Sequence, residues 1–327
     1  MTGRVLRWGL LGTARINRAV IPPLRVSRGN QLVAVASRDA AKATSYAREW
    51  GIERAHGSYE ALLSDPGIDV VYIPLPNHLH AEWAIRAARA GKHVLCEKPL
   101  ALDVAEVDAM EAAARENGVV LAEAFMYRHH PQTLKVKELV DGGAIGPVRL
   151  VRGTFSFPLS RPDDVRLQPE WGGGCLWDLG CYPLSFTRFL LGREPVEVFG
   201  SQVLGPSGID ETFVGQLVFR GGVLAQIDAG FRSPVRAEIE IVGTSGTIRV
   251  RHPWKPVPDQ PILLTRGEET EPVAVAECDR YLLEIEDLAE AVAAGRSPRV
   301  SLAESRGNVA TIVALLESAR EGRPVRL

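Results

Sequence analysis

The stretch WGLLGTARI, residues 8–16, joins an apolar run to the start of a helical pattern through a glycine turn. The apolar residues 5–12 predict a buried strand, and residues 14–27 predict a helix that ends near its two prolines. Gly12 permits a tight turn, Ala14 leaves room for a close approach, and a helix start attracts phosphate. An ordinary glycine turn is the alternative, but the position between strand and helix favours a dinucleotide pyrophosphate. We expect this contact from Gly12, Thr13, Ala14, Arg15 and Ile16.

Outward from this turn, strand and helix patterns alternate through residue 125. Apolar, strand-like runs lie at residues 31–37, 69–75, 92–97 and 119–125. Helical patterns separate them at residues 40–50, 79–90 and 103–117. Near-continuous apolar strands with helical crossovers indicate a parallel sheet covered on both faces. Because such crossovers are right-handed, residues 1–125 are predicted to form a doubly wound, Rossmann-like α/β domain that binds NAD(P).

The pattern changes in the second half of the chain. β-rich segments separated by glycine or proline lie at residues 148–157, 196–204, 211–219, 222–231, 237–243 and 246–251. Several alternate polar and apolar residues, which predicts a large, mainly antiparallel open sheet with one covered face. Two helical stretches close the chain, and Ser301 with Glu304 has capping-box spacing. We expect residues 126–327 to form an α+β domain for substrate binding and oligomerisation, as a homodimer or homotetramer through this sheet.

Composition excludes several classes of partner. The 327 residues carry 38 basic and 40 acidic side chains, a net charge of -2, which provides no electrostatic footprint for nucleic acid or a membrane surface. No apolar run approaches the length of a membrane helix, and the N-terminal apolar stretch is too short for a signal peptide. The four cysteines, Cys96, Cys175, Cys181 and Cys278, form no C-x-x-C pair. We therefore expect a cytoplasmic protein with reduced thiols.

The end of the second predicted strand favours NADP(H) as the cofactor. NAD-dependent enzymes usually carry an acidic residue there, whereas this chain has Ser37 and Arg38 before Asp39. A hydroxyl and a guanidinium suit a 2′-phosphate, and Lys42 adds charge one helical turn later. In the alternative interpretation Asp39 is only a helix cap and Arg38 a solvated surface residue. NAD(H) therefore stays open as the cofactor.

Four motifs together resemble the Gfo/Idh/MocA family of oxidoreductases. They are GLLGTARI (9–16), IPLPNHLH (73–80), CEKPL (96–100) and GGGCLWDLGCYP (172–183). The likeness spans the whole chain, including the order of a nucleotide domain and a sheet domain. AEAFMYRHHPQ (122–132) and Tyr182 are most similar to the branch of dimeric dihydrodiol dehydrogenases and NADP-dependent aldose dehydrogenases, such as D-xylose 1-dehydrogenase. Many family members carry histidine in place of Tyr182.

The resemblance implies that Lys98 of the E-K-P motif projects toward the nicotinamide and the substrate oxygen. Oxidation of an alcohol needs a group that takes the hydroxyl proton as hydride leaves carbon. Tyrosine is a poor base near pH 7, but a neighbouring ammonium favours its phenolate. We assign Tyr182 as this acid/base group and Lys98 as the charge that tunes it, so the two must approach across the predicted domains. Asp178, four residues before Tyr182, shares its helical face and is assigned to substrate or to Lys98; the alternative is a helix N-terminal aspartate.

Further residues join the predicted site through the resemblance. It places Pro74, Leu75, Asn77, His80 and Glu97 around the cofactor. Tyr59 is expected near the adenine, although a core position fits it equally well. Arg166 is expected at the cofactor and, with Arg128 and Trp171, at the substrate pocket, because guanidinium groups and an aromatic face suit a polyhydroxylated ring. Packing alone explains Arg128, Arg166 and Trp171 equally well.

The predicted activity is hydride transfer between nicotinamide and a carbon of a sugar, a sugar derivative or a vicinal diol. One alternative is a ketoreductase of nucleotide-linked keto sugars, which the segments 75–83 and 129–132 also resemble. A second is a glycoside hydrolase that keeps NAD tightly bound, and a third is a cofactor sensor without turnover. No metal is expected, because the histidines at 78, 80, 129 and 130 lack partners at zinc spacing.

Overall fold

The computed structural model describes residues 5–161, 163–257 and 260–327. This part of the chain divides into two compact units. The first unit comprises residues up to His129 together with Asp279–Arg306, and the second comprises His130–Cys278 with Gly307–Leu327. A segment from near the end of the chain thus returns to the first unit. The domain boundary expected after residue 125 stays a prediction.

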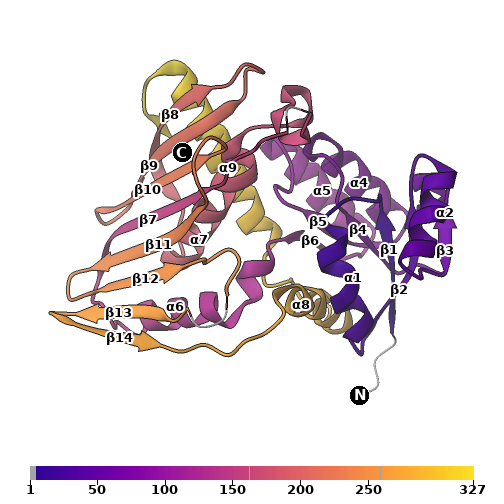
Figure 1. Ribbon diagram of the computed structural model, residues 1–327, viewed down its shortest axis with the longest axis horizontal. Coiled ribbons are helices and arrows are strands. Elements are labelled where there is room, and N and C mark those ends of the chain that lie inside the picture. Colours follow the sequence, from indigo (N-terminus) through magenta and orange to yellow (C-terminus); the bar gives the residue numbers. More distant parts are fainter. Residues whose placement is uncertain (1–4, 162, 258–259) are drawn as a thin grey trace. The chain divides into compact units, whose positions relative to one another are not determined.

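The first unit contains a six-stranded sheet in the order β3-β2-β1-β4-β5-β6, with every pair parallel. Its strands are β1 (Leu6–Leu11), β2 (Asn30–Ala36), β3 (Arg54–His56), β4 (Val70–Ile73), β5 (His93–Glu97) and β6 (Leu121–Ala124). Its helices are α1 (Asn17–Val26), α2 (Ala40–Glu49), α3 (Tyr59–Leu63), α4 (His80–Arg89), α5 (Val104–Glu116) and α8 (Arg280–Ala294). The predicted Rossmann-like architecture is confirmed (Figure 1).

Local chemistry explains where the early helices begin and end. Asp39 caps α2, because its carboxylate accepts the N–H groups of Ala41 at 2.9 Å and Lys42 at 3.1 Å. Gly51 follows α2 with a φ of 56°, which suits glycine. The helix predicted over residues 14–27 forms as α1, which contains both Pro22 and Pro23 and ends at Val26. Burial of the α1 face that includes Pro23 offsets the backbone hydrogen bonds that the two prolines cannot make.

The second unit contains a nine-stranded sheet in the order β14-β13-β12-β11-β7-β10-β9-β8-β15 (Figure 1). Its strands are β7 (Val148–Ser156), β8 (Pro195–Leu204), β9 (Asp210–Phe219), β10 (Val223–Gly230), β11 (Arg236–Gly243), β12 (Thr247–Arg251), β13 (Ile262–Arg266), β14 (Glu269–Val273) and β15 (Val325–Arg326). The pair β7/β10 is parallel and the other neighbours are antiparallel, which confirms a large, mainly antiparallel sheet.

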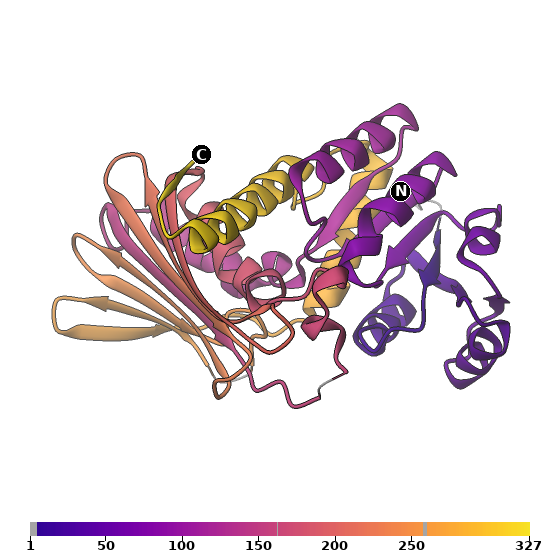
Figure 2. The same cartoon turned by 90° about the horizontal axis from the view of Figure 1, so that it is seen from above.

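Helices cover one face of this sheet. They are α6 (Pro131–Asp141), α7 (Cys181–Leu191) and the part of α9 (Leu302–Glu321) that belongs to the second unit. Figure 2 shows α7 and α9 against the same face, and the hydroxyl of Ser318 accepts the N–H of Gly200 on β8 at 3.0 Å. Val214 and Leu224 on β9 and β10 are 46% and 49% exposed. This alternation of covered and exposed residues is the pattern expected from the sequence.

Two observations concern the whole described chain. Among the residues that the structure describes, no helix is long and apolar enough to cross a bilayer. The four cysteines are free thiols, and three of them are buried.

Candidate functional site

The turn after β1 has the backbone of a phosphate-binding loop. Gly12 has a φ of 124°, which a residue with a Cβ rarely adopts. A Cβ at Gly12 would also lie 3.3 Å from Leu75 and 3.8 Å from the Tyr59 hydroxyl, so the turn, Leu75 and Tyr59 converge. Asn17, fully buried at the start of α1, donates its side-chain amide to the Gly12 carbonyl at 2.9 Å. This hydrogen bond ties the Gly12 turn to the start of the ten-residue helix α1.

The polar groups after β2 lie beside the same turn. Ser37 is buried and its hydroxyl accepts the Asp39 N–H at 3.2 Å, while Arg38 and Lys42 are exposed. Burial raises the pKa of Tyr59, and a hydrogen bond and the charge of Arg38 oppose that rise. Arg38 therefore approaches Tyr59, which in turn approaches the phosphate turn. Asp39 caps α2 as described above, so its carboxylate is already engaged.

Tyr59 serves packing as well as the turn. Its ring meets Trp83 edge-on with centroids 4.9 Å apart, and the residue is 7% exposed. The core position that the sequence left open for Tyr59 is thus observed, together with an approach of its hydroxyl to the turn. Contact with adenine stays a prediction.

Lys98 lies where β5 ends, and hydrogen bonds made by neighbouring side chains fix the turn that carries it. The Lys98–Pro99 peptide bond is cis. Glu97 accepts the Lys98 N–H at 3.3 Å, and Tyr72 donates its hydroxyl to Glu97 at 2.5 Å. Glu123, 1% exposed on β6, accepts the N–H of Leu100 at 2.9 Å. Tyr72 on β4, Glu97 at the end of β5 and Glu123 on β6 therefore fix the backbone from which the Lys98 side chain extends.

His80 links this turn to the preceding one. Its Nδ1 lies 2.8 Å from the Pro99 carbonyl and its Nε2 lies 2.8 Å from the Leu75 carbonyl. A neutral imidazole donates from one nitrogen, so both contacts are hydrogen bonds only in the charged form. Burial opposes that charge and lowers the pKa of His80 to about 4. His80 was predicted at the cofactor. Its observed direct contacts are with the carbonyl groups of Leu75 and Pro99.

The segment between β4 and α4 supplies the remaining predicted cofactor residues. Pro74 is buried directly after β4, whereas Leu75 and Asn77 are half-buried. Asn77 begins a 3-10 turn, Asn77–Leu79, that leads into α4. Because β1, β4 and β5 are parallel neighbours, their carboxyl ends place Gly12, Pro74 and Lys98 along one edge of the sheet.

In the second unit, the glycine-rich motif opens a helical segment that carries two predicted catalytic residues. Leu176–Gly180 is a π-helix, and α7 continues from Cys181, so the regular helix expected around Asp178 is wrong in detail. Asp178 accepts Arg166 Nε at 2.6 Å, and Arg166 also bonds Asp164 at 3.1 Å. The charge of Asp178 raises the pKa of Arg166 above its usual value; hydrogen bonds and the charge of Asp164 add to this rise, and burial opposes it. Two residues predicted for separate roles therefore form one ion pair.

Tyr182 lies one residue into α7 within an aromatic cluster. Its ring meets Phe155 edge-on with centroids 5.3 Å apart and lies 5.9 Å from the Trp254 ring. The residue is 6% exposed, so ring packing restricts where its hydroxyl can lie. Phe155 comes from β7, on the sheet face that the helices cover.

The predicted pocket residues fall into different parts of the chain. Arg128, in the first unit, is 2% exposed and bonds Glu304 at 2.7 Å. Glu304 also forms the predicted capping box with Ser301, each accepting a backbone N–H from the other at 3.2 Å. Trp171 ends a 3-10 turn of the second unit and is 37% exposed. The buried ion pair of Arg128 agrees with the packing alternative, while Trp171 stays accessible.

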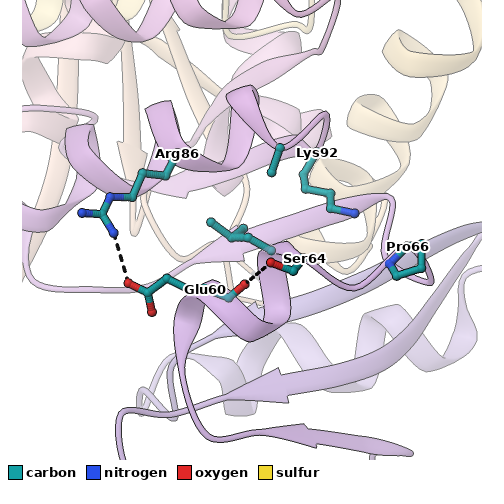
Figure 3. A pocket seen from close by; sticks show the side chains of 7 residues that line it. Glu60, Ser64, Pro66, Arg86 and Lys92 are labelled. Atoms are coloured by element: carbon teal, nitrogen blue, oxygen red, sulfur yellow. Dashed lines mark hydrogen bonds and ion pairs between the residues drawn. The ribbon is translucent and has the colours of Figure 1, made fainter.

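Two surface hollows lie away from the predicted catalytic residues. Figure 3 shows a depression of about 490 Å³ in the first unit, where Arg86 forms an ion pair with Glu60 at 3.1 Å beside Lys92. A second hollow of about 520 Å³ lies in the second unit beside His130, Gln132 and Cys278. Within the described ranges, no group of three His, Cys, Asp or Glu side chains is placed to hold a metal ion.

Sequence reasoning missed two residues that shape the nucleotide half. Asn17 holds the Gly12 turn, and Glu123 holds the chain after Lys98. Glu123 is a carboxylate inside the apolar strand pattern 119–125, and a polar residue at such a position is a signal that could have identified it. Asn17 has Arg15 and Arg18 close by in the sequence, so no comparable signal marks it.

Comparison with known proteins gives matches along most of the chain. A family described as an oxidoreductase family with an NAD-binding Rossmann fold matches residues 6–125, and the GFO/IDH/MocA C-terminal domain matches residues 133–249. D-xylose 1-dehydrogenase (NADP(+)) 2 of Haloferax volcanii is 39% identical over 98% of this chain and 100% of its own. Trans-1,2-dihydrobenzene-1,2-diol dehydrogenase of Danio rerio is 36% identical, covering 96% of each chain.

A solved structure is similar throughout. It is a 3-ketoreductase from Actinomadura kijaniata in complex with NADP and TDP-benzene. It superposes with a TM-score of 0.91 at 32% sequence identity, covering 96% of this chain and 98% of that one.

Proposed function

Because the chain belongs to the Gfo/Idh/MocA family of oxidoreductases, we propose that it transfers hydride between NADP(H) and a carbon of a sugar, a sugar derivative or a vicinal diol. The observation that carries this proposal is the common sheet edge of the first unit, where the Gly12 turn follows β1 and Lys98 follows β5, the two strands that flank β4 in one parallel run. Relatives named as an NADP(+) xylose dehydrogenase and a dihydrodiol dehydrogenase support the substrate class.

The residues of the first unit fit a dinucleotide. The positive φ of Gly12 leaves a hollow that a Cβ would fill, directly before the start of α1. Arg38 and Lys42 supply positive charge for a 2′-phosphate, with the Ser37 hydroxyl beside them. Asp39, the acidic residue nearest this position, caps α2. These features support NADP(H) over NAD(H).

Lys98 and Tyr182 are proposed to handle the proton. Bound NADP+ would supply the hydride acceptor, its nicotinamide ring. The O–H bond of the alcohol breaks as its proton passes to the Tyr182 phenolate, and the carbonyl forms. The Lys98 ammonium favours that phenolate and attracts the substrate oxygen. In the reducing direction, the same phenol returns the proton.

Asp178, Arg166, Arg128 and Trp171 are proposed to shape the substrate pocket. Asp178 held by Arg166 is a carboxylate that accepts substrate hydroxyl groups, and Arg166 keeps donors for the substrate or the cofactor. Trp171 offers an aromatic face to a sugar ring. For Arg128, the ion pair with Glu304 makes a supporting role in the pocket wall the simpler proposal.

A second candidate activity is reduction of a nucleotide-linked keto sugar. The observation that favours it is the likeness to the A. kijaniata 3-ketoreductase solved with NADP and TDP-benzene. The curated dTDP-3,4-didehydro-2,6-dideoxy-alpha-D-glucose 3-reductase of A. kijaniata is 34% identical over 97% of this chain. The chemistry at Lys98 and Tyr182 is the same for both candidates, so the substrate alone separates them.

We also propose a homodimer or homotetramer formed through the nine-stranded sheet, in the cytoplasm. The uncovered face presents Val214 and Leu224 among charged side chains, and a broad sheet face of this kind suits a two-fold interface. Free thiols at all four cysteines support a reducing compartment. Light scattering tests the assembly, and a mass of 35.6 kDa would contradict it.

A panel of substrates tests the activity. Aldoses, polyols and vicinal diols are each incubated with NADP+ and with NAD+, and absorbance at 340 nm is followed. We expect sustained reduction of NADP+ with at least one neutral sugar or diol, and slower reduction of NAD+. Turnover of none of them, combined with oxidation of NADPH by a nucleotide-linked keto sugar, would favour the second candidate. Release of free sugar from a glycoside without a change at 340 nm would contradict both.

A further inference from the structure

Asp210 at the start of β9 reaches the beginning of the helical segment that carries Asp178 and Tyr182. Its Oδ2 accepts the Leu176 N–H at 2.7 Å and the Cys175 thiol at 3.1 Å. Its Oδ1 occupies the space that a side chain at Gly174 would need, and Gly174 has a φ of 126°. The carboxylate therefore takes the place of a helix cap contributed by the segment itself, which has no side-chain cap at Cys175.

This anchor differs from the caps of other helices. Asp39 and Asp103 cap α2 and α5 from directly adjacent positions, and both are exposed. Asp210 is 4% exposed and lies 34 residues from the N–H that it accepts. It forms no ion pair in the described part of the chain, and burial raises its pKa to about 6. A buried carboxylate without a cation opposes stability, which is typical of a residue retained for function.

The anchor is linked to the proposed catalytic residues through the helix. Leu176 precedes Asp178 by two positions and Tyr182 by six, within the continuous helical stretch 176–191. The Asp178 N–H donates to the Gly174 carbonyl at 3.1 Å, so the glycine loop and the first turn move together. Holding the Leu176 backbone therefore fixes the position of the helical stretch along its axis. The positions of the Asp178 and Tyr182 side chains along that axis are fixed with it.

We propose that Asp210 is a positioning residue, whose carboxylate sets the start of the helical stretch 176–191 and thereby places Asp178 and Tyr182 for the reaction. This inference rests on the proposed roles of those two residues. A misplacement of about 1 Å at a reacting group can lower a rate by about a hundredfold, so a neutral side chain at this anchor affects turnover. NADP(H) affinity stays unchanged, because the residues proposed to bind the nucleotide phosphates belong to the first unit.

The test compares D210N with D103N, which removes the charge of an exposed cap on α5. We measure kcat, the substrate KM, the NADPH Kd by fluorescence, and backbone hydrogen exchange of residues 172–185 by mass spectrometry. All assays are run well below each melting temperature. For D210N we expect kcat to fall about 10- to 100-fold, the NADPH Kd to stay within twofold, and exchange across 174–182 to rise. D103N is expected to leave all four quantities unchanged.

Three results would overturn the proposal: an unchanged kcat in D210N, an equal loss of kcat in D103N, or a loss of kcat with no change in exchange. If D210N fails to fold, D210S is measured in the same way, and failure of both to fold shows a purely structural role. The proposed function fails separately, through absence of wild-type turnover on every substrate. In that case the exchange measurement alone decides whether Asp210 orders residues 174–182.

Discussion

The Lys98 turn and the Tyr182 segment carry the two halves of one proposed proton transfer, yet they are fixed by different means. The Lys98 turn is held by Tyr72, His80 and Glu123, all within 25 residues of their partners. The Tyr182 segment is anchored by Asp210, 34 residues away, and by aromatic rings from separate strands and loops. The first arrangement follows from consecutive strands of a parallel sheet, and the second depends on how a large mixed sheet brings distant residues together.

Replacing Lys98 or Tyr182, the residues proposed to handle the proton, should have the largest effect on kcat. We expect this loss for the residue of each region. In K98M and Y182F we expect kcat to decrease about 10²- to 10⁴-fold, the range for loss of a general acid or base. Steady-state rates with the best sugar or diol measure this. K135M removes a lysine on α6 whose ion pair with Glu138 faces solvent, and this variant should retain wild-type kcat. If K98M or Y182F retained wild-type kcat, the region that carries the replaced residue would have no role in the proton transfer.

The pH dependence of stability should have opposite sign in the two regions. Burial lowers the pKa of His80 and of His129 to about 4, below the ordinary value of 6.5. Their contribution is therefore complete above pH 6.5 and is lost as pH falls toward 4. Burial raises the pKa of Asp210 from 3.8 to about 6, so its contribution is complete below pH 3.8 and is lost as pH rises through 6. Each of the His80 and Asp210 shifts corresponds to on the order of 3 kcal/mol.

Urea unfolding between pH 4 and pH 7 measures both contributions. The difference between wild type and H80Q should grow with pH, and the difference between wild type and D210N should shrink or change sign. D210N is thus expected to be as stable as wild type, or more stable, at pH 7 while turning over more slowly. Two difference curves that slope in the same direction would contradict the contrast.

Cofactor choice gives the smallest effect and concerns the nucleotide half alone. One hydrogen bond between charged groups, here Arg38 and a 2′-phosphate, contributes about 1.5–3 kcal/mol to the binding free energy. Because R38A loses this bond, it should raise the KM for NADP+ at least about tenfold. The KM for NAD+, which lacks that phosphate, should stay unchanged. R48A, in the last turn of α2, the helix that follows Arg38, is the matched control. Equal KM changes for both cofactors would assign Arg38 to the surface.

The contrast between the regions also explains what the sequence could predict. The order of strands and helices in the first unit follows from apolar runs and turn residues, and Asp39 and Gly51 mark the ends of α2 as expected. The helix predicted over residues 14–27 forms as α1 with both prolines inside it, because packing of its buried face outweighs the tendency of proline to end a helix.

In the second unit, most strands follow from alternating patterns, but β13 and β14 do not. β14 is exposed along nearly its whole length, so no burial pattern marks it. Asp210 is likewise invisible to a local reading, because its partner Leu176 lies in another element. Tyr182 was assigned with the help of a family resemblance, and Asp178 from its helical spacing to Tyr182, since no local pattern specifies the contacts of a residue that distant strands surround.

A double-mutant cycle tests the central claim most directly, namely that Lys98 and Tyr182 serve a single proton-transfer step. The kcat of K98M, Y182F and the K98M/Y182F double variant are compared with wild type at one pH and at saturating NADP+ and substrate. Residues that act as a unit are strongly non-additive, so we predict that the double variant is about as slow as the slower single variant. A double variant whose loss equals the product of the two single losses would show that the two residues act independently, and would contradict the account.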